Sequence, residues 1–128
     1  MDTSQQTLFE RIGGEEAISA LLSDFYRRVL SDPALARYFH GVSMDKLQRM
    51  QSELFSAALG GPLQYSGRPV IHAHQHLHIT LEDYQRFIKY LFETLRDYRL
   101  TDDESYEVVG RINLYTDEVL SSGVGQLG

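Results

Sequence analysis

Apolar residues recur every three or four positions along most of this chain, and this spacing is the feature that most limits what it can form. Between residues 15 and 30 they fall at Ala17, Ile18, Leu21, Leu22, Phe25, Tyr26, Val29 and Leu30. Such spacing places apolar side chains on one face of an amphipathic helix. Strand-like alternation is confined to residues 70–79. The sequence therefore predicts an all-α fold.

Glycine, proline and capping residues divide this pattern into helices of unequal length. Gly13-Gly14, Ser31-Asp32-Pro33 and Gly60-Gly61-Pro62 interrupt the stripes. Ser43, Thr80 and Thr101 stand where they can cap the helices that follow them. We expect a short opening segment over residues 8–12, helices over 15–30, 44–58 and 81–98 and from 102 onward, and a helical turn after Pro33. A loop is expected over 61–69, followed by a short segment through His78.

The length of the chain sets its domain organisation. A chain of 128 residues can bury about two thirds of the surface that it exposes when unfolded. No internal repeat or linker divides it. We therefore expect one domain over residues 1–128, with a flexible start at 1–6 and a flexible tail at 121–128.

Composition excludes several classes of function. The formal charge of −6 is opposite to what nucleic acids and acidic membranes attract, so neither is an expected partner. The chain has no cysteine, which excludes disulfides, thiolate metal sites and thiol nucleophiles. No segment approaches the roughly 20 apolar residues that span a bilayer, and the first residues are polar. We expect a soluble, cytoplasmic protein.

Four of the five histidines alternate along the chain, at His72, His74, His76 and His78. On a strand they would share one side and could bind zinc, nickel or copper. A lone strand in a helical protein, however, has no partner for its backbone groups. On a helix the histidines would split into two pairs on different faces. The spacing favours the helical interpretation and leaves open whether any of them binds a metal.

Tyr26 and Gln51 are polar residues on otherwise apolar stripes. A buried hydroxyl or amide without a partner costs about 1–3 kcal/mol, so something has to satisfy each of them. They can hydrogen-bond to each other or to the backbone, or they can converge on a polar ligand in an apolar pocket. By contrast, Met44, Met50, Phe39 and Phe55 are ordinary core residues when taken alone. No hydrolase triad or phosphate-binding loop is present.

Several short motifs follow one another in a characteristic order and spacing. They are Leu8 to Ile18, Asp24 to Leu30, Tyr38-Phe39, Ala57 to Pro62, Tyr65 to Arg68 and Ala73-His74. Together they resemble the truncated haemoglobins, and specifically their group I branch. The resemblance covers about residues 7 to 120, and its specificity lies in the order and spacing of the motifs.

This resemblance implies a two-over-two helical sandwich that encloses haem b, with His74 as the proximal iron ligand. It also makes Tyr26 the main hydrogen-bond donor to bound oxygen and Gln51 its distal helper. Phe39 would pack against the haem face. Phe55 would gate an apolar tunnel for small gases.

The remaining pocket residues follow from the same resemblance. Leu47 stands where many globins have a distal histidine. Met50 occupies a position where some relatives carry a sixth iron ligand, and we expect it to line the pocket. Tyr65, Arg68 and His72 are candidates for the haem edge and propionates. His76 and His78 receive no role.

The implied function is the binding of dioxygen, nitric oxide or carbon monoxide, for storage or sensing, by a monomer. Nitric oxide dioxygenation or a peroxidase-like activity would require a reductase partner. The alternative is a non-haem metal-binding module that uses the alternating histidines.

Overall fold

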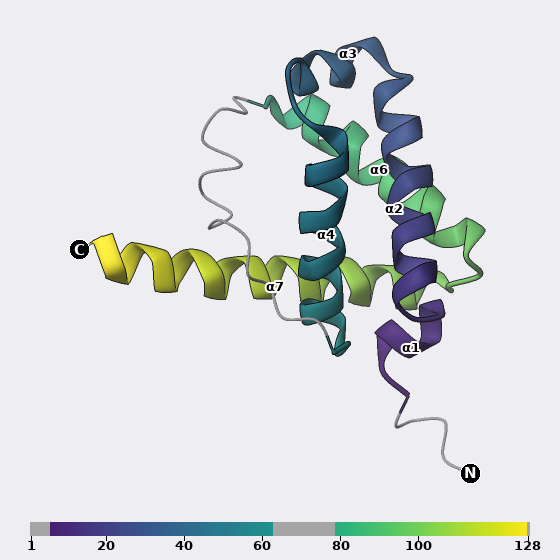
Figure 1. Cartoon of the computed structure of the whole chain (residues 1–128). Helices are drawn as coiled ribbons and strands as arrows, with labels where there is room; N and C mark the ends of the chain where they lie inside the picture. The colour runs from purple at the N-terminus through teal and green to yellow at the C-terminus, as the bar shows by residue number, and fades with distance from the viewer. Residues whose placement is uncertain (1–5, 63–78, 128) are drawn as a thin grey trace.

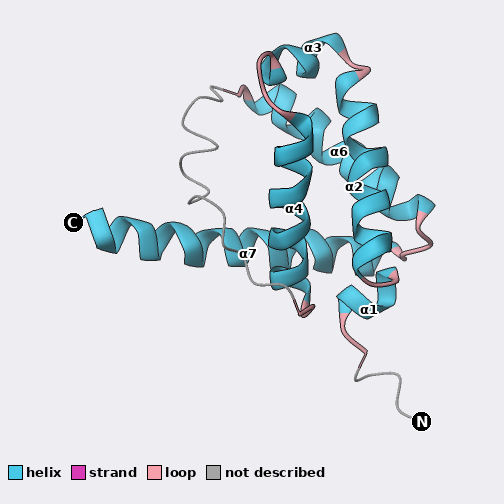
Figure 2. Ribbon diagram, viewed as in Figure 1, coloured by secondary structure: helices cyan, strands magenta, loops and turns pink. Residues whose placement is uncertain are grey.

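The computed structural model describes residues 6–62 and 79–127, with side-chain surroundings for 6–62 and 79–115. Figure 2 shows that the described elements are helices, with no strand among them. The all-α prediction is therefore confirmed for these residues. The elements are α1 (Leu8–Ile12), α2 (Glu15–Leu30), α3 (Pro33–Ala36), the 3-10 helix η2 (Arg37–Phe39), α4 (Met44–Leu59), α6 (Leu81–Asp97) and α7 (Asp102–Leu127).

Two of the three predicted caps form. The Thr80 hydroxyl accepts a hydrogen bond from the Asp83 backbone N–H at 3.1 Å. The Thr101 hydroxyl accepts one from the Glu104 N–H at 3.1 Å, and the Glu104 carboxylate returns a contact to the Thr101 N–H. Ser43 occupies the predicted N-cap position of α4, but its side chain makes no capping hydrogen bond. The predicted starts of these three helices are thus confirmed, and the prediction that the Ser43 side chain caps α4 is wrong.

The long helices pack in two crossed layers. Figure 1 shows α2 and α4 side by side, with α7 running across them. Helix α2 contacts both α4 and α6, and α7 contacts both α4 and α6. The shared core is built mainly from leucine, isoleucine, valine and phenylalanine, including Ile18, Leu21, Leu22, Phe25, Val29, Leu35, Phe55, Leu59, Leu91, Leu95 and Val108.

The C-terminal helix is longer than the sequence predicted. A loose tail was expected over residues 121–128, but α7 continues to Leu127. The segment contains glycine and no proline, and glycine weakens a helix without removing its hydrogen bonds. The flexible start predicted for residues 1–6 lies, apart from Gln6, outside the described residues.

Asp32 ties the turn after α2 to α6. Its buried carboxylate accepts hydrogen bonds from the Ala34 N–H at 3.0 Å and from the Tyr90 hydroxyl at 2.8 Å. The Arg86 guanidinium lies 3.3 Å from the same carboxylate. The Tyr90 bond is the main cause that keeps the pKa of Asp32 below its usual value.

Asp83 makes a second connection between this turn and α6. Its buried carboxylate accepts from the Tyr38 hydroxyl at 2.5 Å and from Arg37 Nη2 at 3.0 Å. The pKa of Asp83 is lowered, chiefly by the Tyr38 bond and then by the Arg37 bond. The segment from α3 through η2 is therefore held to α6 by charged hydrogen bonds as well as by apolar contact.

The lowered pKa values of Asp32 and Asp83 predict acid sensitivity. The folded protein favours the deprotonated form of these carboxylates more strongly than the unfolded chain does. Their contribution to the free energy of unfolding is therefore complete above about pH 5 and is lost as the pH falls below about 4. The midpoint of thermal unfolding, followed by circular dichroism, should drop over that acid range. Asp83→Asn should be less stable at neutral pH and show a shallower acid dependence. An acid dependence equal to that of the wild type would contradict the assignment.

Candidate functional site

Tyr26 lies at the centre of the apolar interior although it carries a hydroxyl. Its side chain is only 3% exposed, because it stands on the buried stripe of α2. Its ring centroid lies 4.9 Å from that of Phe25 and 5.9 Å from that of Phe39, the latter in an edge-on arrangement. The ring is thus fixed between two aromatic neighbours.

The Tyr26 hydroxyl is a polar group in an otherwise apolar interior. Burial raises the pKa of Tyr26, and no hydrogen bond within the described part of the chain contributes to that shift. The hydroxyl therefore stays protonated at neutral pH and remains a potential donor. A protonated hydroxyl in an apolar interior can donate a hydrogen bond to a polar ligand that enters there.

Gln51 lies on the core-facing stripe of α4. Met44, Leu47, Gln51 and Phe55 follow one another at intervals of three or four residues and so share a face of this helix. Met44 and Leu47 pack against the core, and Phe55 is part of it. Gln51 thus lies between two residues of the core-facing stripe, and it is half-buried. Helix α4 packs against α2, which carries Tyr26.

The other predicted pocket residues divide into two groups. Phe39, at the end of η2, is half-buried and packs against the core, and Met50 is half-buried on α4. Tyr65, Arg68, His72 and His74 lie outside the described residues, as do His76 and His78. The structure therefore brings together Tyr26 and Phe39 by direct contact and places Gln51, Leu47 and Phe55 on α4, which packs against α2. The proposed iron ligand and the haem-edge residues stay predictions.

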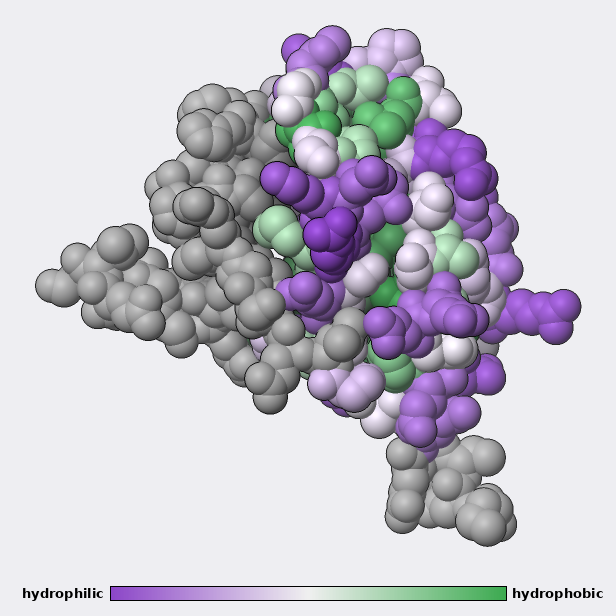
Figure 3. Space-filling model, viewed as in Figure 1, coloured by the Kyte–Doolittle hydropathy of each residue, from purple (hydrophilic) through white to green (hydrophobic). Residues whose placement is uncertain are grey.

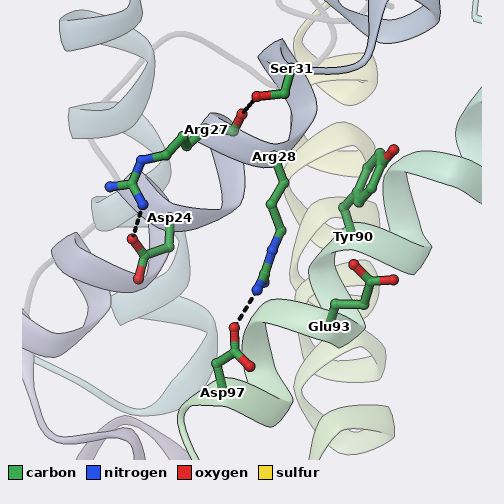
Figure 4. A pocket seen from close by; sticks show the side chains of 7 residues that line it. All are labelled: Asp24, Arg27, Arg28, Ser31, Tyr90, Glu93 and Asp97. Atoms are coloured by element: carbon green, nitrogen blue, oxygen red, sulfur yellow. Dashed lines mark hydrogen bonds and ion pairs between the residues drawn. The ribbon is translucent and has the colours of Figure 1, made fainter.

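A hollow lined by polar and charged side chains lies between α2 and α6. It has a volume of about 500 Å³ and is lined by Asp24, Arg27, Arg28, Ser31, Tyr90, Glu93 and Asp97. Figure 4 shows Arg28 reaching Asp97 and Arg27 reaching Asp24. Arg28 also donates to the Thr94 hydroxyl at 2.6 Å. These groups largely satisfy one another, so the hollow acts as a polar connection between helices.

Metal binding by carboxylates and histidines finds no site in the described ranges. Within residues 6–62 and 79–115, no group of three such side chains lies close enough to hold an ion. Figure 3 shows hydrophilic residues over much of the visible face, with hydrophobic surface gathered near α3. The candidate site is therefore the apolar interior around Tyr26.

Comparison with known proteins decides the family. The profile of the bacterial-like globins matches residues 7–121, which is most of the chain. The chain belongs to this globin family. The match covers α1 through most of α7, so the helices that carry Tyr26, Phe39 and Gln51 are part of the globin domain.

Relatives of known name place this globin in the group I branch. The group 1 truncated haemoglobin GlbN of Mycolicibacterium paratuberculosis is 33% identical over 121 residues, which cover 94% of this chain and 89% of that protein. The group 1 truncated haemoglobin of Tetrahymena pyriformis is 32% identical over 97 residues, covering 76% of this chain and 80% of that protein. The resemblance found in the sequence is thus confirmed.

Solved globin structures confirm the fold class. The Fe(III) form of Tetrahymena pyriformis truncated haemoglobin superposes with a TM-score of 0.76 at 30% identity, over 84% of this chain and 92% of that one. The 2/2 haemoglobin of Synechococcus sp. PCC 7002, in the cyanomet state with covalently attached haem, gives 0.76 at 28% identity, over 90% and 98%. The crossed helix pairs described above are the two-over-two arrangement of truncated globins. A non-haem metal module receives no support.

Proposed function

We propose that this truncated haemoglobin binds oxygen and related diatomic gases at a haem held by His74, with Tyr26 as the main hydrogen-bond donor to the ligand. Membership of the family supplies the cofactor, haem b, and the class of ligand. The observation that carries the residue assignment is the position of Tyr26, a residue with a hydroxyl, on the buried stripe of α2 between the rings of Phe25 and Phe39. It supports a distal pocket organised around this side chain.

The described wall of the pocket fits a haem group. A porphyrin presents a broad apolar surface, and aromatic and aliphatic side chains are the usual lining of such a cofactor site. Tyr26, Phe39, Leu47 and Phe55 provide that lining and belong to one apolar cluster. When bound, ferrous haem with one histidine ligand supplies an open coordination position for a small gas.

Tyr26 and Gln51 divide the polar work in this proposal. Tyr26 donates a hydrogen bond from its hydroxyl to the ligand, and the surrounding apolar residues strengthen that hydrogen bond by lowering the local dielectric. Gln51 supplies a second donor from α4, because its amide can donate two hydrogen bonds. Slow release of oxygen follows from both contacts.

The other residues shape the pocket and hold the cofactor. We assign Phe39 to the haem face, Leu47 and Met50 to the pocket lining, and Phe55 to the route that gases take. Tyr65, Arg68 and His72 are proposed to contact the haem edge and propionates. An arginine suits this task because its guanidinium pairs with carboxylates through two hydrogen bonds.

The setting of the reaction is a further part of the proposal. We infer a monomer in the cytoplasm that stores or senses oxygen. When a reductase supplies electrons, it could instead oxidise nitric oxide to nitrate with bound oxygen or act as a peroxidase. The charge of −6 keeps such a protein dispersed. Among the helices of the described ranges, none combines the length and apolar character needed to cross a membrane.

An absorption spectrum tests the cofactor and the open site together. The purified protein, after addition of haemin and reduction, should show an intense Soret band that shifts at once when carbon monoxide is added. A slow, carbon monoxide-independent phase would mean that Met50 or another side chain occupies the sixth position. Comparison with Met50→Leu identifies that side chain. A preparation that stays colourless with haemin would refute the haem assignment.

Replacement of His74 tests the proximal ligand. His74→Ala should lose stable haem binding, since the iron would have no protein ligand. Haem transfer to an excess of apomyoglobin measures this retention. His76→Ala is the matched control, because the sequence assigns His76 no role, and it should retain haem as the wild type does. Equal retention by the His74 variant would move the ligand to another residue.

Tyr26→Phe tests the distal donor. A hydrogen bond to a partly charged acceptor contributes about 1.5–3 kcal/mol, so its loss should speed oxygen dissociation by about 10- to 100-fold. Stopped-flow displacement of oxygen by carbon monoxide measures the rate. Tyr106→Phe is the control, since Tyr106 is 68% exposed. An unchanged rate in the Tyr26 variant would rule out the donor role.

A further inference from the structure

We propose that Tyr38, Arg37 and Asp83 form a positioning cluster that holds Phe39 against Tyr26 and thereby sets the direction of the Tyr26 hydroxyl. This inference rests on the proposed role of Tyr26 as hydrogen-bond donor to the ligand. None of the three residues needs to touch the ligand, so each is a positioning residue.

Asp83 is the fixed point of the cluster. It lies in the first turn of α6, where its backbone N–H donates to the capping hydroxyl of Thr80. Its carboxylate is buried and accepts from the Tyr38 hydroxyl at 2.5 Å and from Arg37 Nη2 at 3.0 Å. Hydrogen bonds to an ionised acceptor are short and strong, so Tyr38 is tied firmly to α6.

Tyr38 passes this restraint to Phe39. The two residues are neighbours in η2, which has only three residues and follows directly on α3. The Arg37 guanidinium lies over the Tyr38 ring, 4.9 Å from its centre, and so also restrains Tyr38. Because η2 is too short to hold its own geometry, the Tyr38 anchor determines where the Phe39 ring lies.

Both aromatic neighbours of Tyr26 are thus held by one face of α6. Phe39 is held through Tyr38 and Asp83. Phe25 packs edge-on against Phe87, with ring centroids 4.9 Å apart. Asp83 and Phe87 are four residues apart on α6 and so lie on the same face. Since no hydrogen bond among the described residues fixes the Tyr26 hydroxyl, ring packing controls its direction.

A similar tyrosine–aspartate bond elsewhere in the fold provides a control. The Tyr98 hydroxyl donates to Asp24 at 3.0 Å and connects the end of α6 to α2. Tyr38 and Tyr98 are both half-buried, and each bond joins α6 to another element. Tyr98 lies three turns of α6 beyond Phe87 and is not connected to Phe39 by any described contact. Loss of either hydroxyl should cost similar stability, and only loss of the Tyr38 hydroxyl should change the pocket.

The test uses the haem-loaded protein and the variants Tyr38→Phe and Tyr98→Phe. Tyr38→Phe should raise the oxygen dissociation rate by about three- to tenfold, which corresponds to a weakened rather than an absent hydrogen bond. In the carbon monoxide form it should also shift or broaden the C–O stretching band and weaken the nuclear Overhauser contacts between the Phe39 and Tyr26 rings. Tyr98→Phe should lower the unfolding temperature to a similar degree and change none of these readouts.

A double-mutant cycle separates this inference from the proposed function. In a Tyr26→Phe background, Tyr38→Phe should no longer change the oxygen dissociation rate, because it acts through the missing hydroxyl. If Tyr26→Phe alone has no effect, the proposed function fails. If Tyr26→Phe has its effect but Tyr38→Phe leaves the rate and the ring contacts unchanged, the positioning role alone is overturned. Asp83→Asn, which keeps the size of the acceptor, should reproduce the ring displacement.

Discussion

The burial of α2 between α4 and α6 is the interaction on which the rest of the structure depends. Its inner stripe includes Ile18, Leu21 and Val29, which are almost completely withdrawn from water. Apolar burial of this extent contributes about 1.5–3 kcal/mol for each large side chain. The same packing carries Tyr26 into the interior, so the force that folds the protein also places its proposed ligand donor.

The segment after α2, which comprises α3 and η2, is stabilised by a different kind of interaction. Helices α3 and η2 are too short to be stable by themselves, because forming the first helical turn is unfavourable. Asp32 and Asp83 connect this segment to α6 through tyrosine and arginine donors. The segment that carries Phe39 is therefore positioned by ionic hydrogen bonds, whose geometry is more specific than that of apolar contact.

The sequence predicted those features of the fold that follow from the spacing of apolar residues and from helix-breaking residues. The bounds of α2 were right because Gly14 and Pro33 flank a continuous stripe, and Tyr26 stood out because it interrupts that stripe. Helix α7 continues past Gly123 and Gly125 to Leu127, because glycine weakens a helix without ending it. Periodicity gives no sign of the role of Asp83. Its bond to Tyr38 joins residues 45 apart in sequence, and such contacts leave no periodic pattern.

The interior around Tyr26 shows how stability and function are linked in this globin. Tyr26 brings a hydroxyl into an apolar interior, where an apolar side chain could pack without the cost of removing a polar group from water. In the proposed function, a ligand that enters the pocket accepts a hydrogen bond from this hydroxyl, so ligand binding also stabilises the fold. A polar residue kept inside an apolar stripe is therefore more informative about function than any of the residues that pack well around it.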